Sequence, residues 1–505
     1  MKILSSDQIR EADNYTIVHE PIASIDLMER AAMVCRDWLI SSSPFREQKV
    51  VHVFCGLGNN GGDGLAIARL LSEKKYAVCV YILRYSNKCS DDFKTNESRI
   101  RKSPGITILD IHSEKDLEKI IISMGIVIDA VFGSGLNRPV GGLAAEGINF
   151  INKIALPVIA LDIPSGLSAS PTQDTGKFCV RATHTLSFQV PKLSFMFPGD
   201  YKYIGDFTVL EIGLDPKFLE GLETVNYFTT LSEIKKIRKP RGKFSHKGTY
   251  GHALMIAGSY GKIGASILAS KACVKSGTGL LTVHLPKCGY NILQTTLPEA
   301  MVSVDSGDWQ VSILPVIEKY NAIGIGPGLG NDKQTQNVLK LLIQNAKSPL
   351  VLDADALNIL SENKTWLSFL PANTILTPHP KEFDRLAGVS DNDYERYVQL
   401  RDFAFKFSVY VVLKGAHTAI ACPDGLVYFN STGNPGMAKG GSGDVLTGII
   451  TGLLAQGYSP KESAIFGVYW HGLAGDIASE LCSQQTMTAL DIIGNMGRAY
   501  KTISE

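Results

Sequence analysis

The chain has 505 residues, a length that predicts more than one domain, and its formal net charge at pH 7 is +1. Hydrophobic residues make up 45% and charged residues 20% of the sequence, as in globular proteins with a large core. A chain so nearly neutral has no overall field to attract nucleic acid, so we expect no such partner. Its apolar windows are too short for a membrane span, and the start lacks a signal-peptide segment. The nine cysteines form no Cys-x-x-Cys pair, which favours free thiols and a cytoplasmic location.

The first half of the chain begins with helical patterns and continues as an alternation of strands and helices. An apolar stripe at helical spacing in residues 26–40 indicates core or dimer packing. From residue 49 onward, short runs that are apolar on both faces alternate with longer helical segments. These runs are "VVHVF", "AVCVYIL", "GIVIDAVF", "VIALDI" and "THTLSF". Such strands, joined by crossover helices, are typical of a parallel sheet covered on both sides.

A basic segment separates this half from a second alternation of strands and helices. "LSEIKKIRKPRGKFSHKG" holds seven Lys or Arg, and we interpret it as a linker, with a phosphate-binding surface as the alternative. The runs that follow are "HALMIAG", "LLTVHL", "AIGIG", "LVLDAD", "TILTPH" and "VYVVLKG". The sequence therefore predicts an α/β protein of two three-layer αβα domains, at residues 1–220 and 245–505, joined by a basic linker at 221–244.

A glycine-rich turn, "CGLGNNGGDG", fills residues 55–64 between an apolar run and a helical pattern. Gly56, Gly58 and Gly61 fit the spacing of the dinucleotide-binding fingerprint. That fingerprint also requires an acidic residue at the end of the second strand, where this sequence offers Arg84. A hydride-transferring dehydrogenase is therefore disfavoured, although Arg84 suggests tolerance for a ribose 2′-phosphate.

Two later strand ends carry carboxylates. Asp129 precedes a loop of small residues at 133–139, and Asp162 precedes the turn at 164–166. Because ligands of open α/β sheets bind outside the carboxyl ends of the strands, we expect Asn60, Asp129 and Asp162 to converge. Their oxygens suit a cation, and glycine amides at a helix N-terminus suit a phosphate. Burial can raise the pKa of a carboxylate in a cleft, which makes Asp162 a candidate base; capping of a turn is the alternative for each Asp.

The motifs "GNNGGDG", "DAVFGSGL" and "LDIPSG", in this order and spacing, resemble the NAD(P)H-hydrate epimerases over most of residues 1–220. The resemblance implies a Rossmann-like domain that interconverts the R and S forms of NADHX and NADPHX, the hydrated nicotinamide coenzymes. It also implies a catalytic Asp162 and a K⁺ ion held by Asn60, Asp129 and Ser165. The residues that it implies for NADPHX binding are Asn59, Asn60, Gly61, Gly62, Asp63, Gly133, Ser134, Gly135, Leu136, Asn137, Arg138, Pro139 and Asp162.

A long glycine-rich segment dominates the second half, at residues 433–457. The backbone amides of residues 440–443 stand at a helix N-terminus, where they can hold an anion, and Asp444 follows in the first turn. An anion site beside a fixed carboxylate suits phosphoryl transfer, although a glycine-rich turn capped by Asp is the structural alternative. Asp353 and Asp355 are candidates for Mg²⁺ binding through water, with helix capping as the alternative.

The set "GPGLG", "LDADALN", "TPHPKEF", "KGAHT" and "KGGSGD" resembles the ADP-dependent NAD(P)H-hydrate dehydratases over about 245–500. The resemblance implies a ribokinase-like domain that uses ADP and Mg²⁺ to dehydrate S-NAD(P)HX to NAD(P)H, giving AMP and phosphate, with Asp444 as the catalytic residue. For NADPHX it implies Ala265, Gly328, His379 and Asp444. For ADP or AMP it implies Lys414, Gly415, Ala416, His417, Thr418 and Gly443.

Other functions remain open at this level. A ribokinase-like kinase of a small alcohol, with an accessory nucleotide-binding domain, would use the same Asp444 and would differ only in its product. The first half could also be a binding module that has no turnover. The family and the apolar N-terminal helices lead us to expect a homo-oligomer, with NADHX, NADPHX and ADP as the small-molecule partners.

Overall fold

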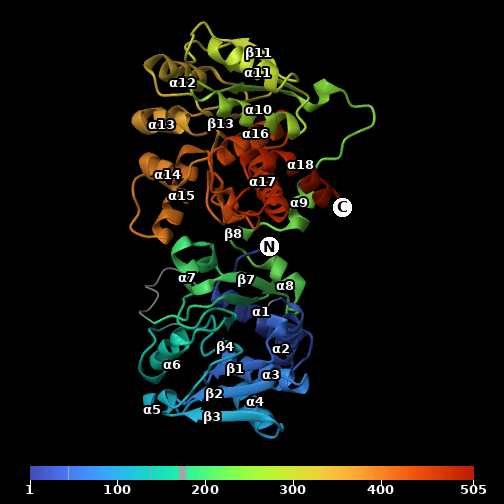
Figure 1. Cartoon of the computed structure of the whole chain (residues 1–505), viewed down its shortest axis with the longest axis vertical. Coiled ribbons are helices and arrows are strands. Elements are labelled where there is room, and N and C mark those ends of the chain that lie inside the picture. The colour runs from blue at the N-terminus through green and yellow to red at the C-terminus, as the bar shows by residue number, and fades with distance from the viewer. Residues whose placement is uncertain (44, 137, 170–177) are drawn as a thin grey trace. The chain divides into compact units, whose positions relative to one another are not determined.

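The computed structural model describes residues 1–43, 45–136, 138–169 and 178–505 (Figure 1). The chain forms two compact units, Lys2–Thr224 and Val225–Glu505, and Met1 belongs to the second. Each unit has its own sheet and its own core, as the alternation of strands and helices predicts. The two units are described separately below.

The first unit contains a seven-stranded sheet in the order β3-β2-β1-β4-β5-β6-β7, and every neighbouring pair is parallel. The chain runs outward from β1 to β3 and then returns to place β4 on the other side of β1. This reversal creates a switch point at the carboxyl ends of β1 and β4. The strands are β1 Val50–Cys55, β2 Ala77–Leu83, β3 Ile106–Ile111, β4 Ile126–Ala130, β5 Val158–Leu161, β6 His184–Phe188 and β7 Asp206–Leu210.

Helices cover both faces of this sheet, because its strands are apolar on both sides. Val53 packs in a cluster with residues of α2, α3 and α4, whereas its neighbour Phe54 packs in a second cluster with residues of α5 and α6. The unit is therefore a three-layer αβα sandwich, as predicted. The helices are α1 Ser6–His19, α2 Ser24–Ser41, α3 Asn59–Glu73, α4 Asp91–Arg101, α5 Glu114–Glu118, α6 Gly142–Lys153, α7 Tyr201–Ile204 and α8 Pro216–Gly221.

Several glycines of the turn between β1 and α3 allow close contacts within the protein. A Cβ atom on Gly56 would lie 2.0 Å from the Val131 carbonyl oxygen, and one on Gly61 would lie 2.0 Å from the Gly56 oxygen. A Cβ on Gly64 would meet the Ala130 Cβ at 2.5 Å. These glycines let α3 start directly against the ends of β1 and β4, so they shape the site rather than bind in it.

The contact at Gly56 gives a prediction about stability. The Gly56→Ala variant should unfold with a free energy lower by about 2 kcal/mol, the usual cost of overpacking, because the methyl group collides with Val131. Urea unfolding followed by circular dichroism measures this difference. Gly58→Ala is the matched control, since a Cβ there meets nothing within 4 Å. Equal stabilities for the two variants would contradict the prediction.

The second unit contains a ten-stranded sheet in the order β11-β10-β9-β12-β13-β14-β15-β16-β17-β8. All pairs from β11 to β15 are parallel, and β16 runs antiparallel to both of its neighbours. The antiparallel strand β16 therefore lies inside the sheet, between β15 and β17, and β8 forms the edge beyond them. The strands are β8 Asn226–Phe228, β9 His252–Ile256, β10 Leu280–Leu285, β11 Met301–Val304, β12 Ala322–Ile325, β13 Leu350–Leu352, β14 Ile375–Leu376, β15 Tyr410–Leu413, β16 Ala419–Ala421 and β17 Val427–Phe429.

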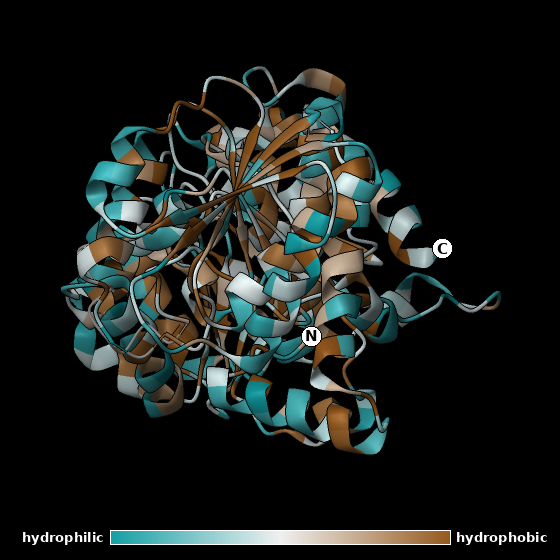
Figure 2. Ribbon diagram, turned by 90° about the horizontal axis from the view of Figure 1, so that it is seen from below, coloured by the Kyte–Doolittle hydropathy of each residue, from teal (hydrophilic) through white to brown (hydrophobic). Residues whose placement is uncertain are grey.

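Helices pack against this sheet, and the hydropathy colouring of the whole chain shows brown strands among helices of mixed colour (Figure 2). Residues of α10, α16, α17 and α18 form one large core with β9 and β10, while α12 to α15 form a separate column (Figure 1). Among the described residues, no helix is both long and apolar enough to cross a bilayer. The helices are α9 Leu231–Ile237, α10 Ile263–Lys275, α11 Tyr290–Thr296, α12 Lys333–Asn345, α13 Asp355–Glu362, α14 Pro380–Ala387, α15 Asp393–Phe407, α16 Ser442–Ala455, α17 Pro460–Cys482 and α18 Ala489–Ser504.

The segment 221–244, expected as a linker, differs from that expectation. Strand β8 pairs in parallel with β17, and α9 contributes the fully buried Ile234 to the core of the second unit. These apolar contacts fix the segment in the second unit, although basic side chains surround them in the sequence. The boundary between the two units lies at Thr224 and Val225.

Candidate functional site

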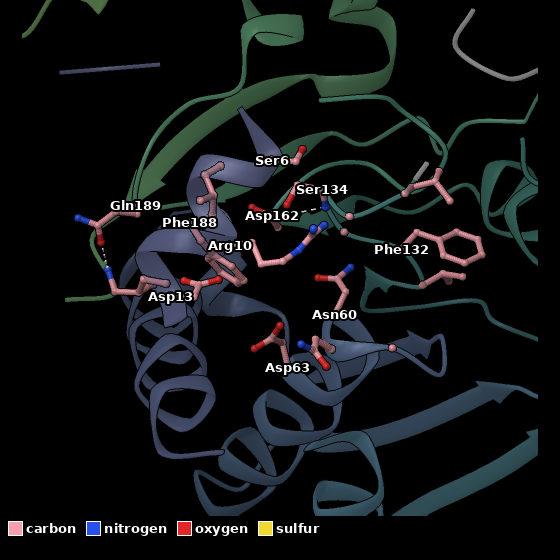
Figure 3. A pocket seen from close by; sticks show the side chains of 18 of the residues that line it. Ser6, Arg10, Asp13, Asn60, Asp63, Phe132, Ser134, Asp162, Phe188 and Gln189 are labelled. Atoms are coloured by element: carbon pink, nitrogen blue, oxygen red, sulfur yellow. Dashed lines mark hydrogen bonds between the residues drawn. The ribbon is translucent and has the colours of Figure 1, made fainter. Parts of the chain in front are cut away.

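A cavity of about 530 Å³ lies in the first unit at the carboxyl ends of β1, β4 and β5 (Figure 3). The start of α3 forms one wall, the loop after β4 forms another, and α1 contributes side chains from outside the sheet. The sheet's switch point, where ligands of open α/β folds bind, therefore holds the cavity. The lining residues are Ser6, Ile9, Arg10, Asp13, Gly58, Asn59, Asn60, Asp63, Tyr85, Val131, Phe132, Gly133, Ser134, Gly135, Leu136, Arg138, Asp162, Phe188, Gln189, Ile212 and Leu214.

Asp162 follows β5 and holds a strained backbone conformation, with φ of +63°. Its Oδ1 lies 2.7 Å from the Nζ of Lys192, which is fully buried, and its Oδ2 accepts a 3.0 Å hydrogen bond from the Ser134 N–H. Burial alone would raise the pKa of Asp162, but the Lys192 ammonium and these hydrogen bonds lower it below the usual value. The expected increase in this pKa by burial is therefore wrong, and Asp162 is an ionised group at neutral pH.

Asn60 lies in the first turn of α3 and is only 8% exposed. Within the part of the chain that the structure describes, neither its side-chain oxygen nor its side-chain nitrogen has a hydrogen-bond partner. A Cβ atom on Gly133 would lie 3.4 Å from both the Asn60 Cβ and the Asp162 Oδ2, so the two side chains stand close together. Because buried amides in native proteins are almost always paired, an unpaired one beside a cavity indicates a ligand.

Asp129 and Ser165 lie behind the cavity wall, and both are fully buried. The Ser165 N–H and Oγ–H donate to the Asp129 carboxylate over 2.8 and 2.6 Å, and the Val131 N–H donates to it over 3.2 Å. Burial raises the pKa of Asp129 to about 6, although these hydrogen bonds oppose the increase. Asp129 and Ser165 thus bond to each other, whereas the Asn60 side chain has no hydrogen-bond partner among the described residues.

Two further carboxyl groups, Asp13 of α1 and Asp63 of α3, face the same cavity. Neither forms a hydrogen bond with any residue that the structure describes. Burial raises the pKa of Asp13 to about 7, with Asp162 adding to the increase and Lys192 opposing it. Burial, Asp162 and Asp13 likewise raise the pKa of Asp63 well above the usual value. The cavity therefore combines one ionised carboxylate with two that hold their protons more tightly.

The second unit brings its predicted residues to the carboxyl ends of β12 to β15. Lys414 follows β15, and its Nζ lies 2.9 Å from the Asp353 Oδ1 and 3.9 Å from the Glu382 Oε2. A Cβ on Gly443 would lie 3.4 Å from the same Nζ. Burial would lower the pKa of Lys414, but Asp353 and Glu382 raise it, so Lys414 stays charged. A fixed cation thus stands beside the glycine-rich start of α16.

Asp444 occupies the first turn of α16, which starts after Gly441 with φ of +94° and without a side-chain cap. The N–H groups of Gly443 and Asp444 have no side-chain cap among the described residues and can hold an anion, whereas the Ser442 N–H already donates to the Lys439 carbonyl oxygen over 3.4 Å. Burial and the Asp353 carboxylate raise the pKa of Asp444 to about 6, while Lys414 opposes the increase. A carboxylate with this pKa is mostly ionised at neutral pH and still accepts a proton readily.

Of the other predicted residues of this unit, Gly328, His379 and Thr418 lie in loops at the same edge, and Ala265 lies in the first turn of α10. Gly328 has φ of +60°, and a Cβ there would lie 3.1 Å from the Ala265 Cβ, so these two residues adjoin. His379 caps α14 by accepting a 3.2 Å hydrogen bond from the Glu382 N–H, and its side chain is 46% exposed. The hydroxyl of Thr418 closes the loop after β15 by accepting a 3.2 Å hydrogen bond from the Gly415 N–H.

The described residues of this site do not form a complete set of protein ligands for Mg²⁺. Asp353 accepts hydrogen bonds from Lys414 and Thr447, over 2.9 and 2.7 Å. Asp355 pairs with Lys262 over 3.2 Å. Among the described residues, no three His, Cys, Asp or Glu side chains form a metal-binding group. Any Mg²⁺ at this site must therefore be held largely by phosphate oxygens, as is common for this ion.

Comparisons with known proteins agree with this division. The family described as YjeF-related protein N-terminus matches residues 24–194, and the family described as NAD(P)H-hydrate dehydratase matches residues 253–497. A bifunctional NAD(P)H-hydrate repair enzyme of Moorella thermoacetica is 35% identical over 524 residues, which cover 100% of this chain and 98% of that enzyme. The chain belongs to the bifunctional NAD(P)H-hydrate repair enzyme family.

Further members of the repair enzyme family and a solved structure support this conclusion. The bifunctional NAD(P)H-hydrate repair enzyme of Escherichia coli is 32% identical, over 93% of this chain and 87% of its own. A ribokinase-like superfamily protein from Enterococcus faecalis is 28% identical, with a TM-score of 0.51, over 56% of this chain and 99% of that structure. The predicted ribokinase-like fold of the second unit is confirmed.

Most residues expected to bind NADPHX in the repair enzyme's first unit line the cavity, but some do not. Gly61 and Gly62 pack against the protein, since a Cβ on them would meet the Gly56 oxygen and the Met28 sulfur at 2.0 and 2.8 Å. Pro139 is not among the lining residues. Asn137 lies outside the described residues. The expected residues that do line the cavity are Asn59, Asn60, Asp63, Gly133, Ser134, Gly135, Leu136, Arg138 and Asp162.

Arg84, expected to favour a 2′-phosphate, does not line the cavity. Its guanidinium forms ion pairs with Asp110, 2.6 Å away, and with Glu97. These carboxylates raise the pKa of Arg84 against the effect of burial. An arginine already neutralised twice is poorly placed to select a phosphate.

The sequence analysis did not identify Arg10 and Asp13, which line the cavity, or Lys192, which pairs with Asp162. Lys192 stands shortly after β6, and attention to every strand end would have found it. Arg10 and Asp13 belong to α1, whose place over the sheet edge follows from tertiary packing alone. The sequence of α1 contains no motif that indicates a functional site.

Proposed function

We propose that the first unit interconverts R- and S-NAD(P)HX, and that the second dehydrates the S form to NAD(P)H with ADP as co-substrate. The observation that carries the first half is an ionised Asp162 in a cavity, beside an unpartnered Asn60. The corresponding observation for the second half is Asp444 next to the uncapped start of α16. A cytoplasmic location and a homo-oligomeric state remain predictions.

In the first unit, Asp162 acts as the base on the hydroxyl group of the nicotinamide ring. Lys192 keeps it ionised, and the hydrogen bond from Ser134 fixes its orientation. Arg10 and Arg138 line the same cavity and provide positive charge for the phosphates of the dinucleotide. The residues expected at the nicotinamide ring and those for the phosphates thus occupy one continuous space.

K⁺ fits the first unit only in part as the side chains stand. Asn60 would hold it through a free oxygen, and Asp129 and Ser165 would contribute once their mutual hydrogen bonds loosen. When bound, the ion supplies positive charge that draws the substrate's oxygen atoms into the site. The short loop after β4, which lines the cavity, orients the substrate.

The Asn60→Ala variant tests this assignment. We expect the K⁺ concentration for half-maximal epimerisation to rise about tenfold or more, because the variant loses a neutral oxygen ligand of roughly 1.4 kcal/mol. Titration of K⁺ against a constant concentration of R-NADHX measures the shift. Asn152→Ala, which alters an amide of α6 away from the cavity, is the control. An unchanged K⁺ dependence in Asn60→Ala would contradict the assignment.

In the second unit, Asp444 accepts the proton of the substrate's hydroxyl group as that oxygen attacks the terminal phosphorus of ADP. AMP leaves, and the amides of residues 440–443 with Lys414 stabilise the transferred phosphoryl group. Phosphate then departs with help from the ring nitrogen's lone pair, and loss of a neighbouring ring proton gives NAD(P)H. Phosphorylation converts a poor leaving group into a good one.

The experiment that tests this function uses the full chain with mixed R,S-NADHX, ADP, Mg²⁺ and K⁺. Absorbance at the NADH band should return completely, with AMP and phosphate formed in equal amounts to NADH. Without ADP, the band should not return, while chromatography should still show exchange between the epimers. A stable phosphate ester in place of NADH would identify a small-alcohol kinase instead.

A further inference from the structure

Asp13 is the carboxyl group that α1 contributes to the cavity. It lies on α1, and Figure 3 shows it with Asp63 and Asp162 around one hollow, over which the Arg10 side chain extends. Its carboxyl group forms no hydrogen bond with any described residue. A half-buried carboxyl without a partner stands ready for a group that only a ligand brings.

The charges that face Asp13 explain its state. Burial and the Asp162 carboxylate disfavour a negative charge there, and the Lys192 ammonium that opposes them is already paired with Asp162 at 2.7 Å. Arg10, one turn earlier on α1, is largely exposed and pairs with Asp7 at 3.2 Å. The paired ammonium offsets only part of these effects, so Asp13 retains its proton up to a pKa of about 7.

The cavity thus holds two carboxyl groups whose environments drive their pKa values apart, a pattern that marks an acid and a base. Asp162 is ionised, and Asp13 is protonated in a large fraction of molecules at neutral pH. Asn60, which is 8% exposed and has two unpartnered polar atoms, independently indicates that a polar ligand lies between the walls.

We propose that Asp13 is a second catalytic residue of the epimerase site, acting as the acid that complements Asp162 as base. This inference rests on the proposed epimerase function. It assigns to α1 a role that none of the sequence motifs indicates. Asp63, deeper beside Asn60, remains a substrate-binding group.

The proton balance shows why two groups are needed. The Asp162 carboxylate takes the proton of the ring hydroxyl, whose electrons form a carbonyl as the bond from that carbon to the ring nitrogen breaks. The nitrogen receives the bond's electron pair and the proton of Asp13. Rotation about the adjacent single bond presents the other face of the carbonyl, and the nitrogen then adds to it. Asp13 recovers its proton from nitrogen, Asp162 returns its proton to oxygen, and no redox change occurs.

The test compares Asp13→Asn with Glu11→Gln, the same carboxyl-to-amide change at an exposed position of the same helix. We expect kcat for epimerisation of R-NADHX to fall about 100-fold in Asp13→Asn with little change in KM, since the amide occupies the space but delivers no proton. Glu11→Gln should match the wild type. Asp13→Glu should recover part of the lost rate, because it restores an acid.

A pH profile separates this role from a structural one. Wild-type kcat should fall as pH rises through about 7, because Asp13 loses its proton there, and Asp13→Asn should lack this decline. Circular dichroism and urea unfolding of the same samples check that the first unit, which carries Asp13, is folded in each variant. Equal kcat and equal pH profiles in wild type and Asp13→Asn would overturn the inference. A wild-type protein that dehydrates S-NADHX but never epimerises R-NADHX would instead overturn the proposed function of the first unit.

Discussion

The Asp444→Ala variant should lose ADP-dependent dehydration of S-NADHX, with kcat lower by about 1,000-fold, and should epimerise R-NADHX at the wild-type rate. The loss follows because Asp444 is the group at the start of α16 that can accept the substrate's hydroxyl proton, and such bases contribute two to four powers of ten. Formation of NADH in a spectrophotometer measures dehydration, and chromatography of the epimers measures the other reaction.

The pH dependence of dehydration provides a second reading of Asp444. Because burial raises its pKa to about 6, the wild-type rate should fall as pH drops below about 6, where the base becomes protonated. Asp402→Asn, an exposed carboxylate of α15, is the matched control and should retain both activity and pH profile. Dehydration by Asp444→Ala at the wild-type rate would remove Asp444 from the mechanism.

The Asp162→Asn variant should epimerise R-NADHX about 100- to 1,000-fold more slowly while dehydrating S-NADHX normally. It should also unfold with a free energy lower by about 3 kcal/mol, because the fully buried Lys192 loses its carboxylate partner. Since the pKa of Asp162 is lowered in the folded state, this difference should be present at neutral pH. It should shrink as pH falls below about 4, where the carboxylate takes up a proton.

A double variant separates chemistry from stability. Asp162→Asn combined with Lys192→Met removes both charges, so the free energy of unfolding should recover in large part. Epimerisation should stay low, because the base is still missing. If the double variant regained both stability and activity, the loss in Asp162→Asn would come from unfolding rather than from the missing base.

The sequence predicted most of the fold because both sheets consist of strands that are apolar on both faces. It placed Asn60 and Asp162 correctly at one edge, since parallel strands align their carboxyl ends. The linker expectation differed from the structure because the single buried Ile234 of α9 is surrounded by basic residues in the sequence. The many basic residues of this segment led to the prediction of a linker, although the segment contributes one apolar side chain to the core.

The ionisation of the site depended on contacts that no local pattern contains. Burial suggested a raised pKa for Asp162, but Lys192 arrives from another strand end and lowers it. The proton that burial would have placed on Asp162 is instead held by Asp13, on a helix more than 140 residues earlier. Such a balance of charges follows from the folded arrangement only.

The presence of both units on one chain suits a substrate that exists as two epimers, which differ in configuration at a single carbon. A chiral dehydratase site accepts one form and leaves the other. Because both units are on one chain, each dehydratase unit is accompanied by one epimerase unit, which converts the rejected form into the accepted one.

The central claim, two independent sites that share one substrate, is tested most directly by mixing two defective variants. With R,S-NADHX, ADP, Mg²⁺ and K⁺, Asp162→Asn should return NADH rapidly only up to the S fraction, and Asp444→Ala should return none. An equimolar mixture should carry the reaction to completion, because substrate passes through solution between intact sites. If Asp162→Asn alone consumed the R form at the wild-type rate, or the mixture stopped at the S fraction, the claim would be contradicted.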